Sequence, residues 1–210
     1  MIDRVKLGRR FARLATDAAV RYPPLWWIFR PFVRRQFDSL APVWDSMRME
    51  DTFAPYEAAL AALDADPARI LDVGTGTGAA VLTLAQRFPS AQIVGVDLAE
   101  RMLDRARENT PLADRERVTF QRADASALPF AAASFDLVTH ANMIPFFDEV
   151  ARVVTPGGHV LFAFSSGAET PIYVEPRRLR TELEERGFAD FAEFDVGRGN
   201  AMLARKSRQA

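Results

Sequence analysis

The chain contains no cysteine, and this absence excludes several kinds of site at once. Without thiols there can be no disulfide, no thiolate-bound metal and no cysteine nucleophile. The two histidines, His140 and His159, are too few for a metal site built from imidazole ligands. We therefore expect no resident metal ion.

Long apolar runs, internal repeats and low-complexity segments are also missing. Although 49% of the residues are hydrophobic, no run approaches the ~20 residues that a membrane-spanning helix needs. The 210 residues suffice for one α/β domain with an appendage. We divide them into a basic, aromatic, helical N-terminal arm and cap (1–60) and a domain (61–210), and we expect a cytoplasmic protein.

Positive charge is concentrated at the N-terminus. Residues 1–35 contain nine Arg or Lys against two Asp, whereas the whole chain carries a net charge of −1. The acidic remainder argues against a nucleic-acid-binding surface. Residues 22–35 add adjacent tryptophans flanked by arginines, a composition suited to a membrane interface. Three interpretations stay open: an arm packed on the domain, peripheral membrane contact, or a transit peptide.

From Ala68 onward, expected strands alternate with expected helices, which predicts an α/β fold with a parallel sheet. Pro156–Gly158 predicts a turn before the fifth strand, and Gly197–Gly199 predicts an antiparallel hairpin at the sheet edge. The expected strands are Arg69–Val73, Gln92–Asp97, Val118–Arg122, Phe135–His140, His159–Phe164, Phe188–Val196 and Asn200–Ala204. The expected helices are Ala79–Phe88, Ala99–Asn109, Phe146–Val154 and Pro176–Arg186.

The segment Ile70–Gly78 is the strongest local signal. A short apolar run stops at Gly74, Gly76 and Gly78, and a helix follows at once. Glycines let the backbone turn sharply and let a ligand approach it closely. The helix start adds unpaired N–H groups and partial positive charge. We expect a nucleotide-like ligand here, although the pattern alone also fits a dinucleotide fingerprint.

Three aspartates lie at or near the carboxyl ends of expected strands, where ligands of parallel sheets bind. Asp97 could accept hydrogen bonds from both ribose hydroxyls, which fits a dinucleotide equally well. Asp124 could accept from an adenine amino group. Asp72 precedes the glycine turn by two residues, an awkward position beside a pyrophosphate but a suitable one for a ligand with an ammonium group.

Together these segments resemble the class I S-adenosylmethionine-dependent methyltransferases over residues 37–164. Residues Gln36–Asp45 also resemble the first segment of the subgroup with the ubiquinone/menaquinone C-methyltransferases. That subgroup commonly has Tyr where this chain has Trp44. The five matching segments are, in chain order, Leu71–Gly78, Val94–Leu98, Asp124–Phe130, Ser134–Val138 and Arg152–Gly158.

The resemblance implies a Rossmann-like, seven-stranded sheet with S-adenosylmethionine as cofactor. The glycines would line its methionine part, with Asp72 near the amino group and Asp97 on the ribose. Leu98 and Met102 would lie against the adenine, and Asp124 with the backbone of Ala125 would read its edge. The cofactor-binding set is Asp72, Gly74, Thr75, Gly76, Gly78, Asp97, Leu98, Met102, Asp124 and Ala125.

Methyl transfer needs alignment of an acceptor more than it needs catalytic side chains. His140 closes the fourth expected strand and is our candidate base for an acceptor that must lose a proton. Trp44, Tyr56, Asn142 and Met143 are expected to line the pocket of a small apolar or amphiphilic acceptor, such as a quinone precursor or a lipid.

Two alternatives remain at this point. The first is an NAD-dependent oxidoreductase of Rossmann type, although no tyrosine is followed by a lysine at the Tyr-x-x-x-Lys spacing. The second is a non-catalytic, cofactor-binding interaction protein.

Overall fold

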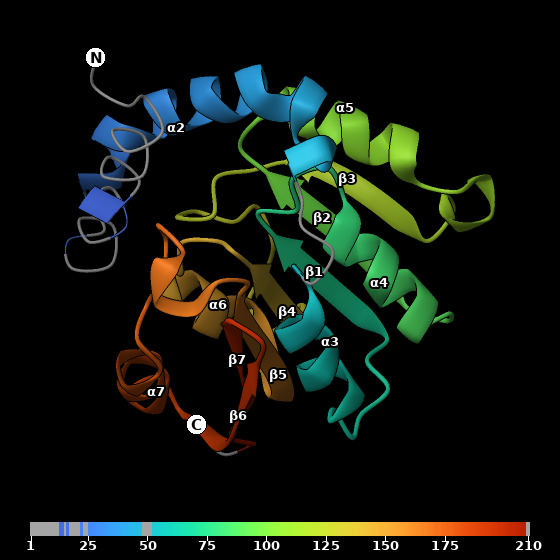
Figure 1. Cartoon of the computed structure of the whole chain (residues 1–210). Helices are drawn as coiled ribbons and strands as arrows, with labels where there is room; N and C mark the ends of the chain where they lie inside the picture. Colours follow the sequence, from blue (N-terminus) through green and yellow to red (C-terminus); the bar gives the residue numbers. More distant parts are fainter. Residues whose placement is uncertain (1–12, 15, 17–21, 23–24, 48–51, 209–210) are drawn as a thin grey trace.

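A seven-stranded sheet forms the centre of the computed structural model, which describes residues 13–14, 16, 22, 25–47 and 52–208 (Figure 1). The strand order is β3-β2-β1-β4-β5-β7-β6. The strands are β1 (Arg69–Val73), β2 (Gln92–Asp97), β3 (Val118–Arg122), β4 (Phe135–Ala141), β5 (Val154–Phe164), β6 (Phe188–Val196) and β7 (Gly199–Lys206).

The first five strands pair in parallel, and β7 lies antiparallel between β5 and β6. The chain order reverses between β1 and β4, so the sheet has its topological switch point there. The carboxyl ends of β1, β2, β3 and β4 therefore meet at one edge. This arrangement confirms the fold class expected from the sequence.

Helices cover both faces of the sheet, because neighbouring residues of each buried strand point in opposite directions. Ile70 packs in a cluster with Val81 and Leu84 of one helix, whereas Leu71 packs in the opposite cluster with Val150. The helices are α2 (Trp26–Leu40), α3 (Ala54–Ala61), α4 (Ala79–Arg87), α5 (Glu100–Asn109), α6 (Phe147–Val153) and α7 (Pro176–Glu184).

One turn predicted from the sequence is wrong. β5 begins at Val154, five residues before the expected start, so Pro156–Gly158 lies inside the strand. Phe135 of β4 pairs with Val154, and Leu137 pairs with His159, which makes the intervening residues a bulge. Gly157 has a φ of +81° there, which a glycine adopts without strain.

The N-terminal part contributes two helices with different roles. α2 passes over the edge where the parallel strands end and contacts α5, and η2 (Ala41–Val43) and η3 (Asp45–Met47) follow it (Figure 1). α3 lies in the core, since Tyr56 and Leu60 are buried against the sheet. The division at residue 60 thus falls within a core helix. Most of residues 1–24 lie outside the described part, and the role of that basic arm stays a prediction.

β6 is one of the two edge strands of the sheet. Its pairing with β7 is interrupted between Ala189 and Ala192. Asp190, within this interruption, has a φ of +51°. Glu193 and Asp195 follow on the same strand.

Candidate functional site

The glycine turn after β1 is fixed by the backbone of β2. The N–H groups of Gly74 and Thr75 both donate to the carbonyl of Val96, at 2.8 and 2.9 Å. Gly74, Gly76 and Gly78 have φ values of +74°, +54° and +87°, so each adopts the left-handed conformation that side chains disfavour. Gly78 then precedes the first residue of α4. The turn therefore needs these glycines for its shape.

Asp97 connects this turn to the start of α5. Its Oδ2 accepts a hydrogen bond from the N–H of Gly76, and its Oδ1 accepts one from the N–H of Ala99, both at 2.9 Å. Burial raises the pKa of Asp97, and these backbone hydrogen bonds oppose the rise. Asp97 thus shapes the turn as well as lying where the ribose is expected.

Asp72 lies directly before the turn with one oxygen unsatisfied. Its Oδ1 accepts from the Thr139 hydroxyl at 2.7 Å, whereas its Oδ2 is buried with no hydrogen-bond partner among the described residues. The hydroxyls of Tyr56 and Thr75 are also buried there, and no hydrogen bond joins them to any residue that the structure describes. Burial raises the pKa of Asp72 to about 6, and the nearby hydroxyls of Thr139 and Thr75 oppose this rise. A cationic donor would satisfy this acceptor.

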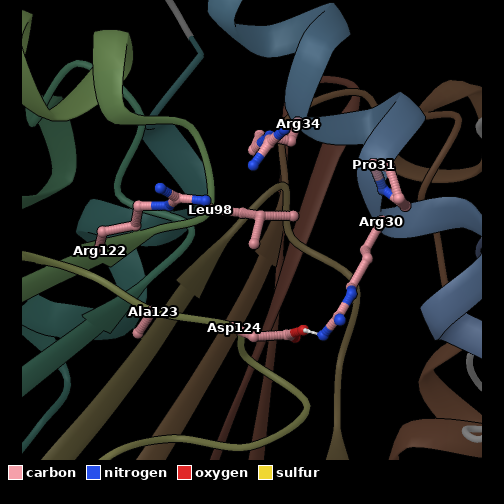
Figure 2. A pocket seen from close by; sticks show the side chains of 7 residues that line it. All are labelled: Arg30, Pro31, Arg34, Leu98, Arg122, Ala123 and Asp124. Atoms are coloured by element: carbon pink, nitrogen blue, oxygen red, sulfur yellow. Dashed lines mark hydrogen bonds and ion pairs between the residues drawn. The ribbon is translucent and has the colours of Figure 1, made fainter.

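Asp124 follows β3 and is bound by helix α2, a contact that the sequence did not predict. The indole Nε1 of Trp26 donates to Asp124 Oδ1 at 2.9 Å, and Arg30 donates to Oδ2 at 3.1 Å (Figure 2). Burial raises the pKa of this carboxyl, but hydrogen bonds from Ser126, Trp26 and Arg30 outweigh it and hold the pKa below its ordinary value. Asp124 is therefore an ionised acceptor.

A cavity of about 460 Å³ opens beside Asp124. Leu98 lines this cavity, and its contact with an adenine stays a prediction. Met102 instead is buried in a cluster with Ala41 and Ala99, beneath the end of α2. The cavity is lined by Arg30, Pro31, Arg34, Leu98, Arg122, Ala123 and Asp124 (Figure 2).

The loop after Asp124 is held from α6 by a pair of residues that the sequence analysis missed. Glu149 accepts from the N–H of Leu128 at 2.6 Å, and Arg152 donates to the carbonyls of Leu128 and Phe130. Arg152 also pairs with Glu149 at 2.7 Å. Their spacing on one helix face was the available signal. Ala125, in this loop, is buried in the core.

Two of the predicted acceptor-pocket residues, Met143 and Trp44, have side chains close to the glycine turn. A side chain at Gly74 would meet Met143 Sδ at 2.6 Å, and one at Gly76 would lie 3.6 Å from Nε1 of Trp44. Trp44 is positioned by an edge-to-face contact with Phe37. Met143 and Trp44 therefore approach the turn from two different segments of the chain.

The other two pocket candidates have structural partners. Asn142 has a φ of +55°, and its Oδ1 accepts from the N–H and the hydroxyl of Ser165, so it joins the ends of β4 and β5. Tyr56 is buried on α3, where burial and then the charge of Asp72 raise its pKa. Tyr56 therefore lies beside Asp72. That the two line an acceptor pocket stays a prediction.

His140 is 1% exposed and stacks on Phe162, with ring centroids 4.6 Å apart. Burial lowers its pKa to about 3, and neither ring nitrogen has a partner among the described residues. At neutral pH the imidazole is therefore uncharged and enclosed in the core. A role as base stays a prediction, and these surroundings favour a packing role.

The comparisons with known proteins agree with this geometry. Residues 70–158 match the family described as "Methyltransferase domain". The chain is 37% identical over 141 residues to the demethylmenaquinone methyltransferase of Deinococcus radiodurans, covering 61% of this chain and 58% of that protein. It is 35% identical over 152 residues to the malonyl-[acyl-carrier protein] O-methyltransferase of Halorhodospira halophila, covering 68% of this chain and 50% of that protein.

Among solved structures, phosphoethanolamine N-methyltransferase 2 of Haemonchus contortus, in complex with S-adenosyl-L-methionine, has the same fold. The TM-score is 0.67 at 18% identity, over 85% of this chain and 60% of that one. The chain thus spans only part of these relatives. Residues 70–158 are thus similar to a methyltransferase domain, and the chain resembles methyltransferases of menaquinone and ubiquinone biosynthesis.

Proposed function

We propose that this protein transfers a methyl group from S-adenosylmethionine to a small apolar or amphiphilic acceptor. One observation carries most of the proposal: Oδ2 of Asp72 is buried beside the glycine turn and has no hydrogen-bond partner in the part of the chain that the structure describes. An ammonium group of the cofactor would satisfy that oxygen, whereas a pyrophosphate would be repelled by the carboxylate. The site therefore favours S-adenosylmethionine over NAD.

The residues divide the work of holding the cofactor. Asp72 would pair with its amino group, the glycine turn would pass along its methionine part, and Asp97 would accept from its ribose. Leu98 and Asp124 would hold the adenine in the lined cavity. When bound, S-adenosylmethionine supplies a methyl group already activated on a sulfonium, so the chain mainly has to align the acceptor and exclude water.

Met143 and Trp44 have side chains that approach the glycine turn, where we place the acceptor. Met143 lies against Gly74, and the indole of Trp44 lies near Gly76, so both reach the methionine end of the proposed cofactor site. This surface supports an acceptor with an apolar part. The two curated relatives named above carry different acceptors in their names.

Methyl transfer from radiolabelled S-adenosylmethionine into a bacterial extract tests the proposal. We expect label in the organic-extractable fraction, with the Asp97→Asn variant as the inactive control. Calorimetry with S-adenosylhomocysteine and NADH runs beside it. Tighter binding of NADH would overturn the assignment, and cofactor binding without any transfer would favour a non-catalytic binding protein.

Cofactor affinity should rise with pH because of Asp72. Its pKa of about 6 means that the free protein is partly protonated at this carboxyl in mildly acidic solution. That proton must leave before the carboxylate can pair with an ammonium group. We expect the affinity for S-adenosylhomocysteine to increase about tenfold between about pH 5 and pH 7. Calorimetry at several pH values measures this affinity. The Asp72→Asn variant should bind weakly, with an affinity that does not change with pH. A pH dependence as steep as that of the wild type in this variant would contradict the assignment.

We further propose that the outer side of α2 contacts a membrane surface. Ile28 and Phe32 share one face of the helix and are 43% and 57% exposed, and the neighbouring Trp27 is 66% exposed. Arginines on the same helix suit anionic headgroups. No helix in the described part of the chain is long and apolar enough to span a bilayer.

Co-sedimentation with phosphatidylglycerol vesicles tests this contact. Changing Trp27 and Phe32 together to Ser should weaken binding about tenfold or more, because two large side chains would no longer enter the interface. Leu112→Ser is the matched control, since Leu112 is 79% exposed and lies outside α2. Equal sedimentation of the double variant and the wild type would refute the contact.

A further inference from the structure

Asp124 divides its two carboxylate oxygens between two kinds of donor. Oδ1 accepts three hydrogen bonds, from the N–H of Ser126 at 3.0 Å, its hydroxyl at 2.7 Å, and Trp26 Nε1 at 2.9 Å. Within the described part of the chain, Oδ2 accepts only from Arg30, at 3.1 Å. Oδ1 is therefore saturated by the fold, and Oδ2 is the oxygen with acceptor capacity to spare.

The two α2 residues are held very differently. Trp26 is 3% exposed and meets the Phe146 ring edge-to-face, with centroids 5.4 Å apart. The Arg30 side chain is 52% exposed and extends from α2 across the cavity to Asp124 (Figure 2). A buried hydrogen bond to a charged group is a firm restraint, whereas an ion pair open to solvent is easily exchanged.

We infer that Trp26 and Arg30 act in opposite directions on cofactor binding through this one carboxylate. Trp26 is a positioning residue: it fixes Oδ1 and so presents Oδ2 to the adenine amino group. Arg30 competes with that amino group for Oδ2 and covers the cavity until the cofactor enters. The inference rests on the proposed function, in which Asp124 reads the adenine.

The cavity itself supports an exchange at this position. Leu98 and Asp124 line the same space as Arg30, so an adenine placed there would meet the guanidinium directly. Arg34 and Arg122 also line it and add positive charge near Asp124, so a displaced Arg30 meets further repulsion on that side. A displaced Arg30 side chain, which is already half exposed, would therefore turn toward solvent. Cofactor entry and release of the Arg30 ion pair are thus linked.

Calorimetry of the full chain with two ligands tests the inference. S-adenosylhomocysteine carries the 6-amino group, and S-inosylhomocysteine carries an oxo group in its place. Trp26→Phe keeps the aromatic ring and removes the N–H; we expect about three- to tenfold weaker binding of S-adenosylhomocysteine and a smaller preference over the inosyl ligand. Arg30→Gln should bind S-adenosylhomocysteine about two- to fivefold more tightly.

Two controls separate this role from a loss of folding. Arg35→Gln changes an exposed arginine on the same helix and should leave both affinities unchanged. Damage to the fold by Trp26→Phe would weaken both ligands equally, so the ratio of the two affinities is the diagnostic quantity. Wild-type affinity should also rise modestly with added salt, which weakens the Arg30 pair, and this dependence should disappear in Arg30→Gln.

Each outcome has a defined consequence. Opposite effects of the two variants, with the control unchanged, support the inference. Weaker binding in both, or no change in either, overturns it while leaving the proposed function intact. Failure of the wild-type protein to bind S-adenosylhomocysteine would instead overturn the proposed function.

Discussion

The Asp97→Asn variant should lose most of its affinity for S-adenosylhomocysteine. Both oxygens of Asp97 accept from backbone N–H groups, those of Gly76 and Ala99. An asparagine offers one acceptor oxygen, so its NH₂ group would face one of these N–H donors. Hydrogen bonds to charged groups contribute about 1.5–3 kcal/mol, and the ribose contact would weaken as well. We expect at least about a hundredfold weaker binding, measured by calorimetry.

The matched control is Asp104→Asn on α5, an exposed aspartate that pairs with Arg107 at the surface. Loss of this ion pair should measurably change neither the affinity for S-adenosylhomocysteine nor the thermal stability, because exposed ion pairs contribute little. If Asp97→Asn bound the cofactor as tightly as the wild type does, the position of the cofactor over this turn would be wrong. Backbone amide exchange at Gly76 would show whether the turn had loosened.

The second large effect is expected from Gly74→Ala. The added methyl group would lie 2.6 Å from Met143 Sδ and 2.8 Å from its Cγ, at a residue whose φ is +74°. The left-handed conformation costs about 1–2 kcal/mol for a residue with Cβ, and overpacking typically adds about 1–3 kcal/mol. We expect a lower free energy of unfolding by about 2–5 kcal/mol and a loss of cofactor binding.

A second substitution separates the two causes. Met143→Ala in the same chain removes the two closest contacts, those with Sδ and Cγ, and leaves the 3.1 Å contact with Cβ and the backbone strain. The double variant should therefore regain part of the lost stability in chemical denaturation. The two effects should be non-additive, because Gly74 and Met143 are in contact. Strict additivity in the double-mutant cycle would show that Met143 does not press on the turn in solution.

The parallel strands were predictable because the strands indicated by the local sequence are the strands that pair in the sheet. Arg69–Val73, Gln92–Asp97 and Val118–Arg122 are strands with the predicted bounds. Arg69–Val73 and Gln92–Asp97 are mostly apolar runs between turn residues, which is typical of strands inside a parallel sheet, whereas Val118–Arg122 is a partly exposed edge strand. The fifth strand differed because Pro156 and Gly157 lie in a bulge, and local sequence does not distinguish a bulge from a turn.

The local geometry of the site was predictable where the backbone or the strand end calls for a particular residue type. The glycines of the turn adopt positive φ, and Asp97 lies at the end of β2. The site was not predictable where the contact spans the chain. Trp26 and Arg30 lie 98 and 94 residues before Asp124, and no spacing rule links positions so far apart. Met102 was assigned to the adenine from its place in the resembling segment, and that role stays a prediction. The structure places it in a buried cluster with Ala41, directly after α2.

The interrupted edge strand β6 has a consequence for self-association. An exposed edge presents unpaired N–H and C=O groups to any other strand that can align with it. The register shift between Ala189 and Ala192 breaks that alignment, and Asp190 and Asp195 would bring like charges together if two such edges met. The sheet can therefore end at β6 without recruiting a second copy of itself, which protects the protein from edge-to-edge aggregation at high concentration.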